Sequence, residues 1–357
     1  MSTDRFVFAI PGDIQTQTGG YIYDRRLIGE LRAQGREMEH LELGASFPNP
    51  TEADTQDAAD KLARIPSTSP VIIDGLALGA LDKAAVAAMS APLVALVHHP
   101  LALEGGLEAS RREYLFQTER DNLRQAQHVI VTSPHTAELL SRDYGVPEAR
   151  ITIAQPGTDQ PVRGTKTLDV PLIVSVGIQV PRKGHDVLLR ALAEIVNIPW
   201  QAVIAGSVLD AAYGATLETL RDQLGLTNRV RFAGHVSEDE LAELYRQASV
   251  FALATRFEGY GMVFNEAMAH GLPIVSCRTG AVPDTVAPDG SVLVPPDDPK
   301  QFATALSSVL EDTAVRHTMA EASAEAGRML ITWEQTAAAV GAVLDGLQGS
   351  SGHNKTP

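Results

Sequence analysis

The 357-residue chain contains a single cysteine, Cys277, so no disulfide can form within it. Scarcity of cysteine is typical of proteins in a reducing compartment. The sequence also lacks a run of the roughly 18 apolar residues that a membrane span needs. Its N-terminal apolar run, residues 6–10, is too short for the hydrophobic region of a secretory signal. These absences predict a soluble cytoplasmic protein and leave peripheral contact with the inner face of a membrane open.

Basic residues are also in short supply. Lysine and arginine number 29 against 44 aspartates and glutamates, for a net charge of −15. A chain without an overall basic footprint is not expected to bind nucleic acid. Residues 25–37 contain four arginines, but acids lie close by, so a solvated helix face is favoured over a membrane-binding one.

Several motifs of cofactor and metal chemistry are absent. The sequence contains no D-x-D pair and no cysteine–histidine cluster with zinc-ligand spacing. It contains neither the G-x-G-x-x-G dinucleotide fingerprint nor a P-loop, and no G-x-S-x-G nucleophile turn. We therefore expect no bound metal and no required cofactor.

Short apolar runs alternate with amphipathic stretches, and the series begins again after a break. The predicted strands are 5–12, 70–75, 92–99 and 128–133, then 171–177, 201–207, 229–235, 249–255, 272–277 and 291–296. The predicted helices are 18–35, 81–89, 111–127 and 135–145, then 185–196, 215–226, 238–248, 263–271 and 299–312. This alternation predicts an α/β protein with two Rossmann-like domains that face each other across a cleft.

The break between the two series, residues 154–171, is polar and contains three prolines and two glycines. We predict an N-terminal domain over 1–160 and a C-terminal domain over 161–332. A helix over 333–347 could pack on either domain, with the N-terminal domain as the candidate, and 348–357 is predicted to be a disordered tail. Because ligands of parallel sheets bind beyond the carboxyl ends of the strands, site residues should directly follow strands.

The stretch EGYGMVFNEAMAHGLP, residues 258–273, follows one predicted strand. Gly259 and Gly261 allow close backbone approach to a ligand, and the helix that begins near Met262 directs free N–H groups the same way. Glu266 could accept hydrogen bonds from a ribose diol, and Glu258 would lie near a sugar.

Two other interpretations of this acid pair stay open. The glutamates could be a capping acid and an acid that interacts with the helix dipole. They could also be a glycosidase pair, although eight residues on one helix span about 12 Å, whereas the carboxyl groups of a retaining glycosidase lie about 5 Å apart. The spacing therefore disfavours a glycosidase. It does not exclude one, because Glu258 is expected in a loop.

Cations follow another predicted strand, which ends at Gly177. Arg182 and Lys183 precede a helix that begins near Gly184. Two cations beside a helix N-terminus are suited to bind a diphosphate and to stabilise charge on a departing nucleotide. The alternative is a solvated surface pair.

The N-terminal half offers fewer candidates. Gly19 and Gly20 precede a helix and could approach a phosphate, and Gln17 just before them is an acceptor-side candidate. His98 and His99 end a strand, where a side chain faces a ligand rather than the core. Either histidine could contact substrate or be structural.

These motifs resemble those of the retaining glycosyltransferases of family 4, which have the GT-B architecture. Glu258–Pro273 matches the E-x7-E signature of that family throughout, and the segments RKGHDVLLRAL, IAGS and GAVPDTV occur in the expected order. The resemblance covers most of the chain and is strongest over about 171–296. It implies a hexosyltransferase with two Rossmann-like domains, in which the N-terminal domain binds the acceptor.

The resemblance also implies roles for individual residues. Glu266 would hold the ribose and Lys183 the diphosphate, with Gly20 lying against that diphosphate. His98 would reach the sugar near the reacting centre, with His99 as the competing assignment. The donor sugar would be held by Glu258 and by the backbone of Gly259, Tyr260, Gly261 and Met262, and Val263 is a further candidate for binding the donor or its nucleotide.

One position departs from the family pattern, and another differs from the residue that the family often has. Asp284 stands where the family often has glutamate. Ile178 stands where many members carry an arginine, five residues before the lysine, so Arg182 is the candidate for the missing cation and the diphosphate contacts must differ.

The implied reaction is transfer of a sugar from a nucleotide-sugar to an acceptor hydroxyl with retention of configuration, by a metal-independent front-face mechanism. A UDP-sugar is the first choice of donor, with GDP- and ADP-sugars as alternatives, and the acceptor is not identified. Two other functions on the same architecture stay open: a nucleotide-sugar 2-epimerase and an inactive sugar-nucleotide-binding protein.

Overall fold

The computed structural model describes residues 5–161 and 168–351. Its contacts divide the chain into two compact units, one formed by Met1–Gly157 with Ile331–Pro357 and the other by Thr158–Leu330. The division thus follows Gly157, close to the predicted boundary at residue 160. Residues 162–167 of the predicted linker and 352–357 of the predicted tail lie outside the described residues.

The first unit is built on a six-stranded sheet with the order β2-β1-β3-β4-β5-β6, in which every neighbouring pair is parallel. Its strands are β1 (Arg5–Pro11), β2 (Glu37–Leu43), β3 (Val71–Asp74), β4 (Leu93–Val97), β5 (His128–Val131) and β6 (Ile151–Ile153). Its helices are α1 (Gly19–Ala33), α2 (Glu52–Ala63), α3 (Gly75–Leu78), α4 (Lys83–Ala87), α5 (Ala109–Leu123), α6 (Pro134–Tyr144) and α14 (Trp333–Ser351), with 3-10 turns η1 (Leu101–Leu103) and η2 (Glu148–Arg150).

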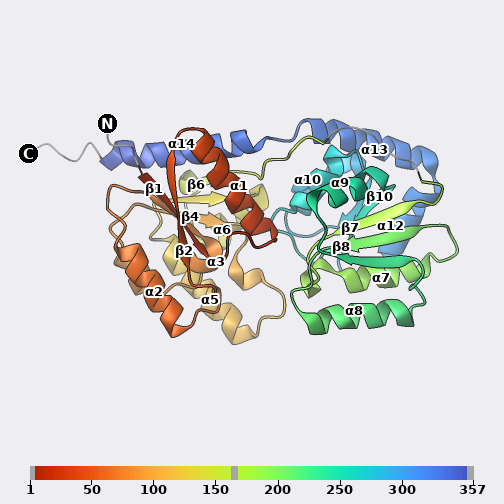
Figure 1. Ribbon diagram of the computed structural model, residues 1–357, viewed down its shortest axis with the longest axis horizontal. Coiled ribbons are helices and arrows are strands. Elements are labelled where there is room, and N and C mark those ends of the chain that lie inside the picture. Colours follow the sequence, from red (N-terminus) through yellow and green to blue (C-terminus); the bar gives the residue numbers. More distant parts are fainter. Residues whose placement is uncertain (1–4, 162–167, 352–357) are drawn as a thin grey trace, which may run out of the picture. The chain divides into compact units, whose positions relative to one another are not determined.

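Helix α14 belongs to this first unit although it comes last in the chain. It packs against α1 and the edge strand β6 (Figure 1). Trp333 at its start meets the ring of Tyr23 edge to face, with centroids 5.6 Å apart. The helix continues to Ser351, past the predicted end at residue 347, so it includes the first residues of the predicted tail.

The second unit repeats the plan with a parallel sheet in the order β12-β11-β10-β7-β8-β9. Its strands are β7 (Leu172–Val176), β8 (Gln201–Ala205), β9 (Val230–Gly234), β10 (Val250–Leu253), β11 (Ile274–Cys277) and β12 (Ser291–Val294). Its helices are α7 (His185–Glu194), α8 (Ala211–Gln223), α9 (Glu238–Gln247), α10 (Met262–Ala269), α11 (Val282–Thr285), α12 (Pro299–Glu311) and α13 (Thr313–Arg328), with 3-10 turns η3 (Pro181–Lys183) and η4 (Pro288–Gly290).

The prediction of two Rossmann-like α/β units is confirmed, and the predicted strands are present. The central strands β4 and β10 are buried along their whole length, because helices cover both faces of a parallel sheet and the strand sequences are accordingly continuous apolar runs. The prediction missed the strands β2 and β6 and the helices α2, α3, α11 and α13. Strand β2 reads EMEHLEL and lies at a sheet edge, where charged side chains reach solvent, so it lacks the apolar run by which the others were found.

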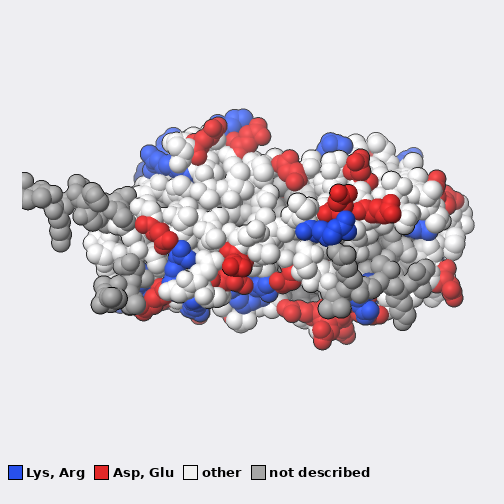
Figure 2. Space-filling view, turned by 90° about the horizontal axis from the view of Figure 1, so that it is seen from above, with Lys and Arg blue, Asp and Glu red and all other residues white. Residues whose placement is uncertain are grey.

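The described part of the chain contains no helix that is long and apolar enough to cross a membrane. Each arginine of the segment 25–37 interacts within the first unit. The contacts are Arg25 to the carbonyl of Ile14, Arg26 over the ring of Trp333, Arg32 to the carbonyl of Met38, and Arg36 to the carboxylate of Asp345. On the face drawn in Figure 2, acidic and basic side chains are intermingled. Peripheral membrane contact stays a prediction.

Candidate active site

Two loops of the second unit carry most of the predicted site residues. Strands β7 and β10 are neighbours in the sheet, so the loops that follow their carboxyl ends lie side by side. The two loops are hydrogen-bonded to each other: the amide of Arg256 donates to the carbonyl of Arg182 at 2.8 Å, and the hydroxyl oxygen of Thr255 lies 3.1 Å from the same carbonyl. The sheet order therefore brings Arg182 and Lys183 to the E-x7-E segment.

The centre of this arrangement is the carboxylate of Glu258, of which only 4% of the residue surface is exposed. Lys183 Nζ donates to Glu258 Oε1 at 2.7 Å, and Arg182 Nη1 lies 3.5 Å from Oε2. Thr255 Oγ1 also donates to Oε1, at 3.0 Å. Burial alone would raise the pKa of Glu258, but the charges of Lys183 and Arg182 and the hydrogen bonds outweigh burial and hold that pKa below its ordinary value. Glu258 is therefore an anion beside two cations.

Glycine and a second ion pair shape these loops. Gly184 has φ +63°, and a Cβ there would lie 1.9 Å from the carbonyl oxygen of Ala254, so the loops could not approach each other with a larger residue. Arg256 stabilises the same region. Its Nη1 and Nη2 donate to the two carboxylate oxygens of Asp186 at 2.9 and 2.8 Å, and its Nε donates to Asp297 Oδ1 at 2.7 Å. These contacts fix the backbone that carries Lys183.

Helix α10 begins directly after the loop, as predicted. Gly261 precedes it with φ +90° and provides no side-chain cap, so the first N–H groups of the helix, at Met262 and Val263, are directed to the same edge of the sheet. Tyr260 is buried, and its hydroxyl accepts a hydrogen bond from Asn265 at 2.8 Å. Only the backbone of Tyr260 is thus presented at the site, next to that of the buried Gly259.

Glu266 lies one turn into α10. Tyr245 Oη donates to Glu266 Oε2 at 2.7 Å, which orients the carboxylate. Burial raises the pKa of Glu266, and the Tyr245 hydrogen bond offsets part of that rise. Among the described residues, none donates to the other carboxylate oxygen.

The position that departs from the family pattern lies beside the same cluster. Gly177 directly follows β7. It packs against the stem of Lys183, as a Cβ there would lie 3.2 Å from Lys183 Cδ. Ile178 is partly buried, and it is Arg182 that reaches Glu258. Asp284, in the short helix α11, is exposed.

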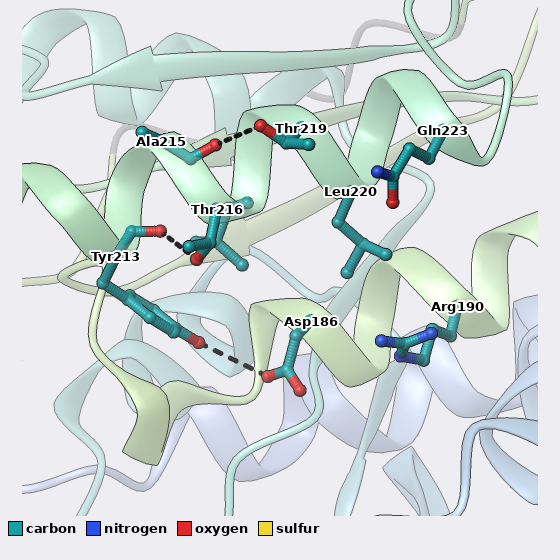
Figure 3. A pocket seen from close by; sticks show the side chains of 9 residues that line it. Asp186, Arg190, Tyr213, Ala215, Thr216, Thr219, Leu220 and Gln223 are labelled. Carbon is teal, nitrogen blue, oxygen red and sulfur yellow. Dashed lines mark hydrogen bonds between the residues drawn. The ribbon is translucent and has the colours of Figure 1, made fainter.

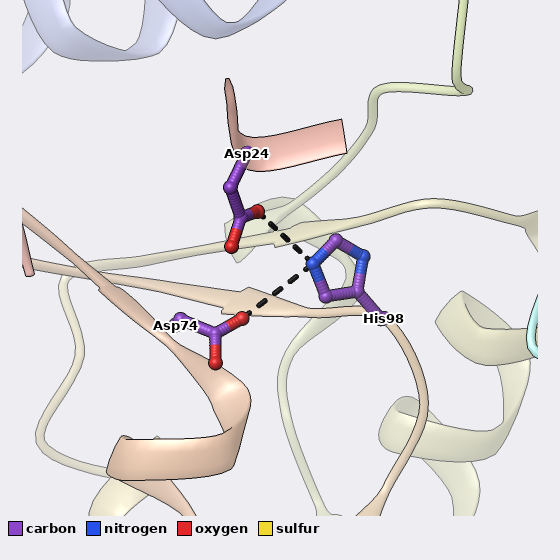
Figure 4. A group of neighbouring side chains, drawn as sticks. All are labelled: Asp24, Asp74 and His98. Carbon is purple, nitrogen blue, oxygen red and sulfur yellow. Dashed lines mark hydrogen bonds and ion pairs between the residues drawn. The ribbon is translucent and has the colours of Figure 1, made fainter. Parts of the chain in front are cut away.

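In the first unit, His98 follows β4 and contacts two buried aspartates (Figure 4). His98 Nε2 lies 3.1 Å from Asp24 Oδ1 and 3.5 Å from Asp74 Oδ2, and each aspartate side chain is 2% exposed. Burial alone would lower the pKa of His98, but the two carboxylates outweigh it and raise that pKa to about 10. Burial and the neighbouring Asp74 raise the pKa of Asp24 to about 7, against the opposing effect of His98.

The remaining predicted residues of this unit divide into two groups. Gly20 lies beside His98, since a Cβ on Gly20 would be 3.3 Å from His98 Cδ2. His99 faces elsewhere, with its Nε2 2.5 Å from Glu104 Oε1. Gln17 and Gly19 are exposed. Gly20 and His98 are thus brought together, whereas His99 has a separate environment.

Asp24 and Asp74 were missed by the sequence analysis. Asp74 ends β3, so the rule that selected His98 could have found it. Asp24 lies four positions after Gly20 on the buried face of α1, where a charged side chain is unusual without a partner. With His98 they form a group whose potential ligand atoms all lie within 4.8 Å of one another, the arrangement among the described residues that could hold a metal ion.

A surface cavity of about 520 Å³ lies between α7 and α8 (Figure 3). Asp186 and Arg190 line it from α7, and Tyr213 and Leu220 from α8. Tyr213 Oη donates to Asp186 Oδ1 at 3.4 Å. Asp186 also forms the ion pair with Arg256. None of the predicted donor-site residues lines this cavity.

Two family models match the chain. One, described as glycosyl transferases group 1, matches residues 158–326, and the other, glycosyltransferase family 4, matches residues 69–160. Among curated proteins, an MMP alpha-(1->4)-mannosyltransferase from Mycolicibacterium hassiacum is 29% identical over 318 residues, covering 84% of this chain and 76% of that protein. A D-inositol 3-phosphate glycosyltransferase from Corynebacterium efficiens is 34% identical over 202 residues, covering 54% of this chain and 47% of the relative. The chain thus aligns with about half the length of the latter.

Solved structures share the fold over nearly the whole chain. Sucrose-phosphate synthase from Thermosynechococcus elongatus superposes with a TM-score of 0.80 at 22% identity, covering 97% of this chain and 100% of that one. Anabaena Alr3699/HepE in complex with UDP-glucose superposes with a TM-score of 0.75 at 16% identity, covering 95% and 99%. At these identities the structures establish the GT-B fold alone. Taken with the two family models, they show that the chain belongs to the glycosyltransferases of group 1 and family 4, a family of transferase enzymes with the GT-B fold.

Proposed function

We propose that the protein transfers a sugar from a nucleotide-sugar to an acceptor hydroxyl with retention of the anomeric configuration. The observation that carries the proposal is the buried ion cluster of Glu258, Lys183 and Arg182, at the carboxyl edge of the second sheet and directly before α10. It combines one carboxylate with two cations, so it holds an excess positive charge where a diphosphate would bind.

The donor is held by groups of different chemistry. Lys183 and Arg182 bind the diphosphate, together with the N–H groups at the start of α10. Glu266, oriented by Tyr245, accepts hydrogen bonds from the ribose hydroxyls through its remaining oxygen. Glu258 accepts hydrogen bonds from the sugar hydroxyls. The backbone of residues 259–262 forms further hydrogen bonds with the sugar.

The bond from the anomeric carbon to the phosphate oxygen breaks, and a bond from that carbon to the acceptor oxygen forms on the same face. The acceptor proton passes to the departing phosphate, so no protein nucleophile is needed. Lys183 and Arg182 stabilise the negative charge that develops on the leaving nucleotide, which supports a reaction without a metal ion. Glu258 does not act as a general acid, because its lowered pKa keeps it ionised, whereas a glycosidase acid needs a raised pKa.

The donor we propose is a UDP-sugar, with GDP- and ADP-sugars as alternatives. Support comes from a protein of the same fold, Anabaena Alr3699/HepE, whose structure is a complex with UDP-glucose. The two curated relatives differ in the compounds that they are named for, so neither name identifies the acceptor of this chain.

A thermal-shift screen with UDP, UDP-glucose, GDP-mannose and ADP-glucose tests the donor class. A ligand present at about 100 times its Kd adds about 2.7 kcal/mol to the free energy of unfolding. We expect one nucleotide and its sugar to stabilise the protein with and without EDTA. If no nucleotide stabilises it, the proposal is wrong.

The stabilising nucleotide-sugar is then incubated with and without candidate acceptors. We expect anomeric-retaining product with an acceptor and at most slow hydrolysis without one. Conversion of the sugar to its 2-epimer in the absence of an acceptor would identify an epimerase, and binding without any turnover would identify an inactive binding protein.

A further inference from the structure

The contact between His98 and two aspartates is unusual because two carboxylates share one ring nitrogen. Asp24 reaches His98 Nε2 from α1, and Asp74 reaches it from the end of β3. Both carboxylates are almost fully buried, so neither has water to stabilise its charge. The mechanism proposed above makes no use of either aspartate.

The geometry defines the protonation of this nitrogen. His98 Nε2 lies 3.1 Å from Asp24 Oδ1, so a hydrogen lies between the two atoms. It belongs to His98, because the pKa of His98, about 10, is above that of Asp24, about 7. Asp74 Oδ1 already accepts the amide of Leu76 at 2.9 Å, which leaves its Oδ2 for the histidine. Nε2 therefore carries a proton that both carboxylates stabilise.

The other ring nitrogen is turned away from the aspartates, as Figure 4 shows. The ring itself is held in place by Tyr23, whose ring meets it edge to face with centroids 5.1 Å apart, and by the close approach of Gly20. The hydroxyl of Thr132 donates to the His98 carbonyl at 3.2 Å. About 20% of the side chain is exposed, and Nδ1 of His98, unlike Nδ1 of His185, is not a fully buried atom without a partner.

We propose that Asp24 and Asp74 are positioning residues that keep His98 doubly protonated and direct its Nδ1–H toward an oxygen of the sugar substrate as a fixed cationic donor. The proposal rests on the transferase function, in which His98 faces the substrate. Two buried negative charges offset the desolvation of one imidazolium, whereas one carboxylate would leave the ring nearer to neutrality. A divalent cation bound by the same three residues would need the Nε2 lone pair and is therefore incompatible with this assignment.

The first test measures the protonation of His98 directly, without reference to activity. The Cε1–H resonance of His98, assigned from the His98→Asn variant, is followed by NMR from pH 5 to pH 10. We expect the ring to remain charged beyond pH 8, and Asp24→Asn or Asp74→Asn to lower the pKa of His98 by about 1–3 pH units each. Asparagine at 74 still accepts the amide of Leu76, so this variant removes charge and keeps the helix cap.

Glu119→Gln is the matched control, because Glu119 is also a buried acid of the first unit but accepts the amide of Leu101 and does not contact His98. We expect the control to leave the His98 titration unchanged. A His98 pKa below 7 in the wild type, or titration unaffected by both aspartate variants, would overturn the proposal. Loss of the Cε1–H signal or a change in its titration on adding Zn²⁺ or Mg²⁺ at 1 mM would also overturn it, in favour of a metal site.

The second test is a double-mutant cycle on turnover with the donor found in the thermal-shift screen. If the aspartates act through His98, Asp74→Asn lowers kcat by about tenfold with little change in KM, and in the double variant with His98→Asn it has no additional effect beyond about twofold. Additive losses would assign Asp74 a merely structural role. If the protein proves not to be a transferase, only this second test is lost, and the NMR titration still decides the state of His98.

Discussion

The two units of the molecule each bury a charged cluster beside the carboxyl ends of their strands, and the clusters have opposite compositions. In the second unit, one carboxylate, Glu258, is surrounded by Lys183 and Arg182. In the first unit, one ring, His98, is surrounded by two carboxylates. In each cluster, the two groups of like charge determine the ionisation state of the third group. The cations keep Glu258 ionised, and the aspartates keep His98 protonated. The comparison shows that one fold, used twice, can hold buried clusters of opposite composition at the ends of its strands.

Removing a cation from the second cluster should have the largest effect. We expect Lys183→Ala to lower kcat with the cognate nucleotide-sugar by about 10²–10³, since loss of one well-placed charge-stabilising donor raises the barrier by about 2.7–4 kcal/mol. Steady-state kinetics measures this. Arg190→Ala is the control, because Arg190 is an exposed cation on the adjacent helix α7, and it should leave kcat unchanged. Near-normal turnover in Lys183→Ala would refute the assignment of the cluster.

Removing the single carboxylate of that cluster should destabilise the fold. Glu258→Gln leaves two cations facing each other in a buried site, so we expect a loss of about 3 kcal/mol at pH 7, as for other broken buried ion pairs. Urea denaturation measures the difference. Because the folded pKa of Glu258 is below its ordinary value of 4.5, the contribution is present above pH 4.5 and is lost as the pH falls through the folded value. A gap between wild type and variant that widens below pH 4.5 would contradict this account.

The first cluster should respond to pH in the opposite direction. The folded pKa of His98 is raised from 6.5 to about 10, so its contribution to stability is complete below pH 6.5 and is lost as the pH rises toward 10. We expect the stability advantage of the wild type over His98→Asn to shrink steadily as the pH rises from 6 to 9.5. Urea denaturation at the two pH values decides it. An advantage that grows with pH would show that the ring is neutral in the fold.

A pair of glycine substitutions in α1 should give the smallest effects. The pair distinguishes a glycine that contacts the candidate site from one that only affects the stability of the helix. Gly29 is exposed in mid-helix with open space around it, so Gly29→Ala should stabilise the protein by about 0.5–1 kcal/mol without changing turnover. Gly20→Ala should keep the fold but lower turnover, because the added methyl group lies 3.3 Å from His98 Cδ2. Thermal unfolding and kinetics on both variants test this, and equal activity in the two would remove Gly20 from the site.

Local patterns in the sequence were sufficient for most of the fold. Continuous apolar runs such as VFAL in β10 are typical of strands buried on both faces, and their alternation with amphipathic stretches indicates a doubly wound topology. Edge strands escape this reasoning: β2 alternates charged and apolar residues because its outer side is solvated, and β6 has only three residues. The segment 258–273 was recognisable because its glycines, acids and helix start are contiguous in the chain.

The sequence by itself thus determined the fold class, the family and the position of the E-x7-E loop, since all three depend on residues that are neighbours along the chain. The partners of those residues were decided by the tertiary structure. Lys183 meets Glu258 across 75 positions because β7 and β10 are adjacent in the sheet. His98 meets Asp24 across 74 positions because α1 lies beside the residue that follows β4. A buried charge needs its counter-charge close in space rather than close in sequence, and only the folded chain shows which residue provides it.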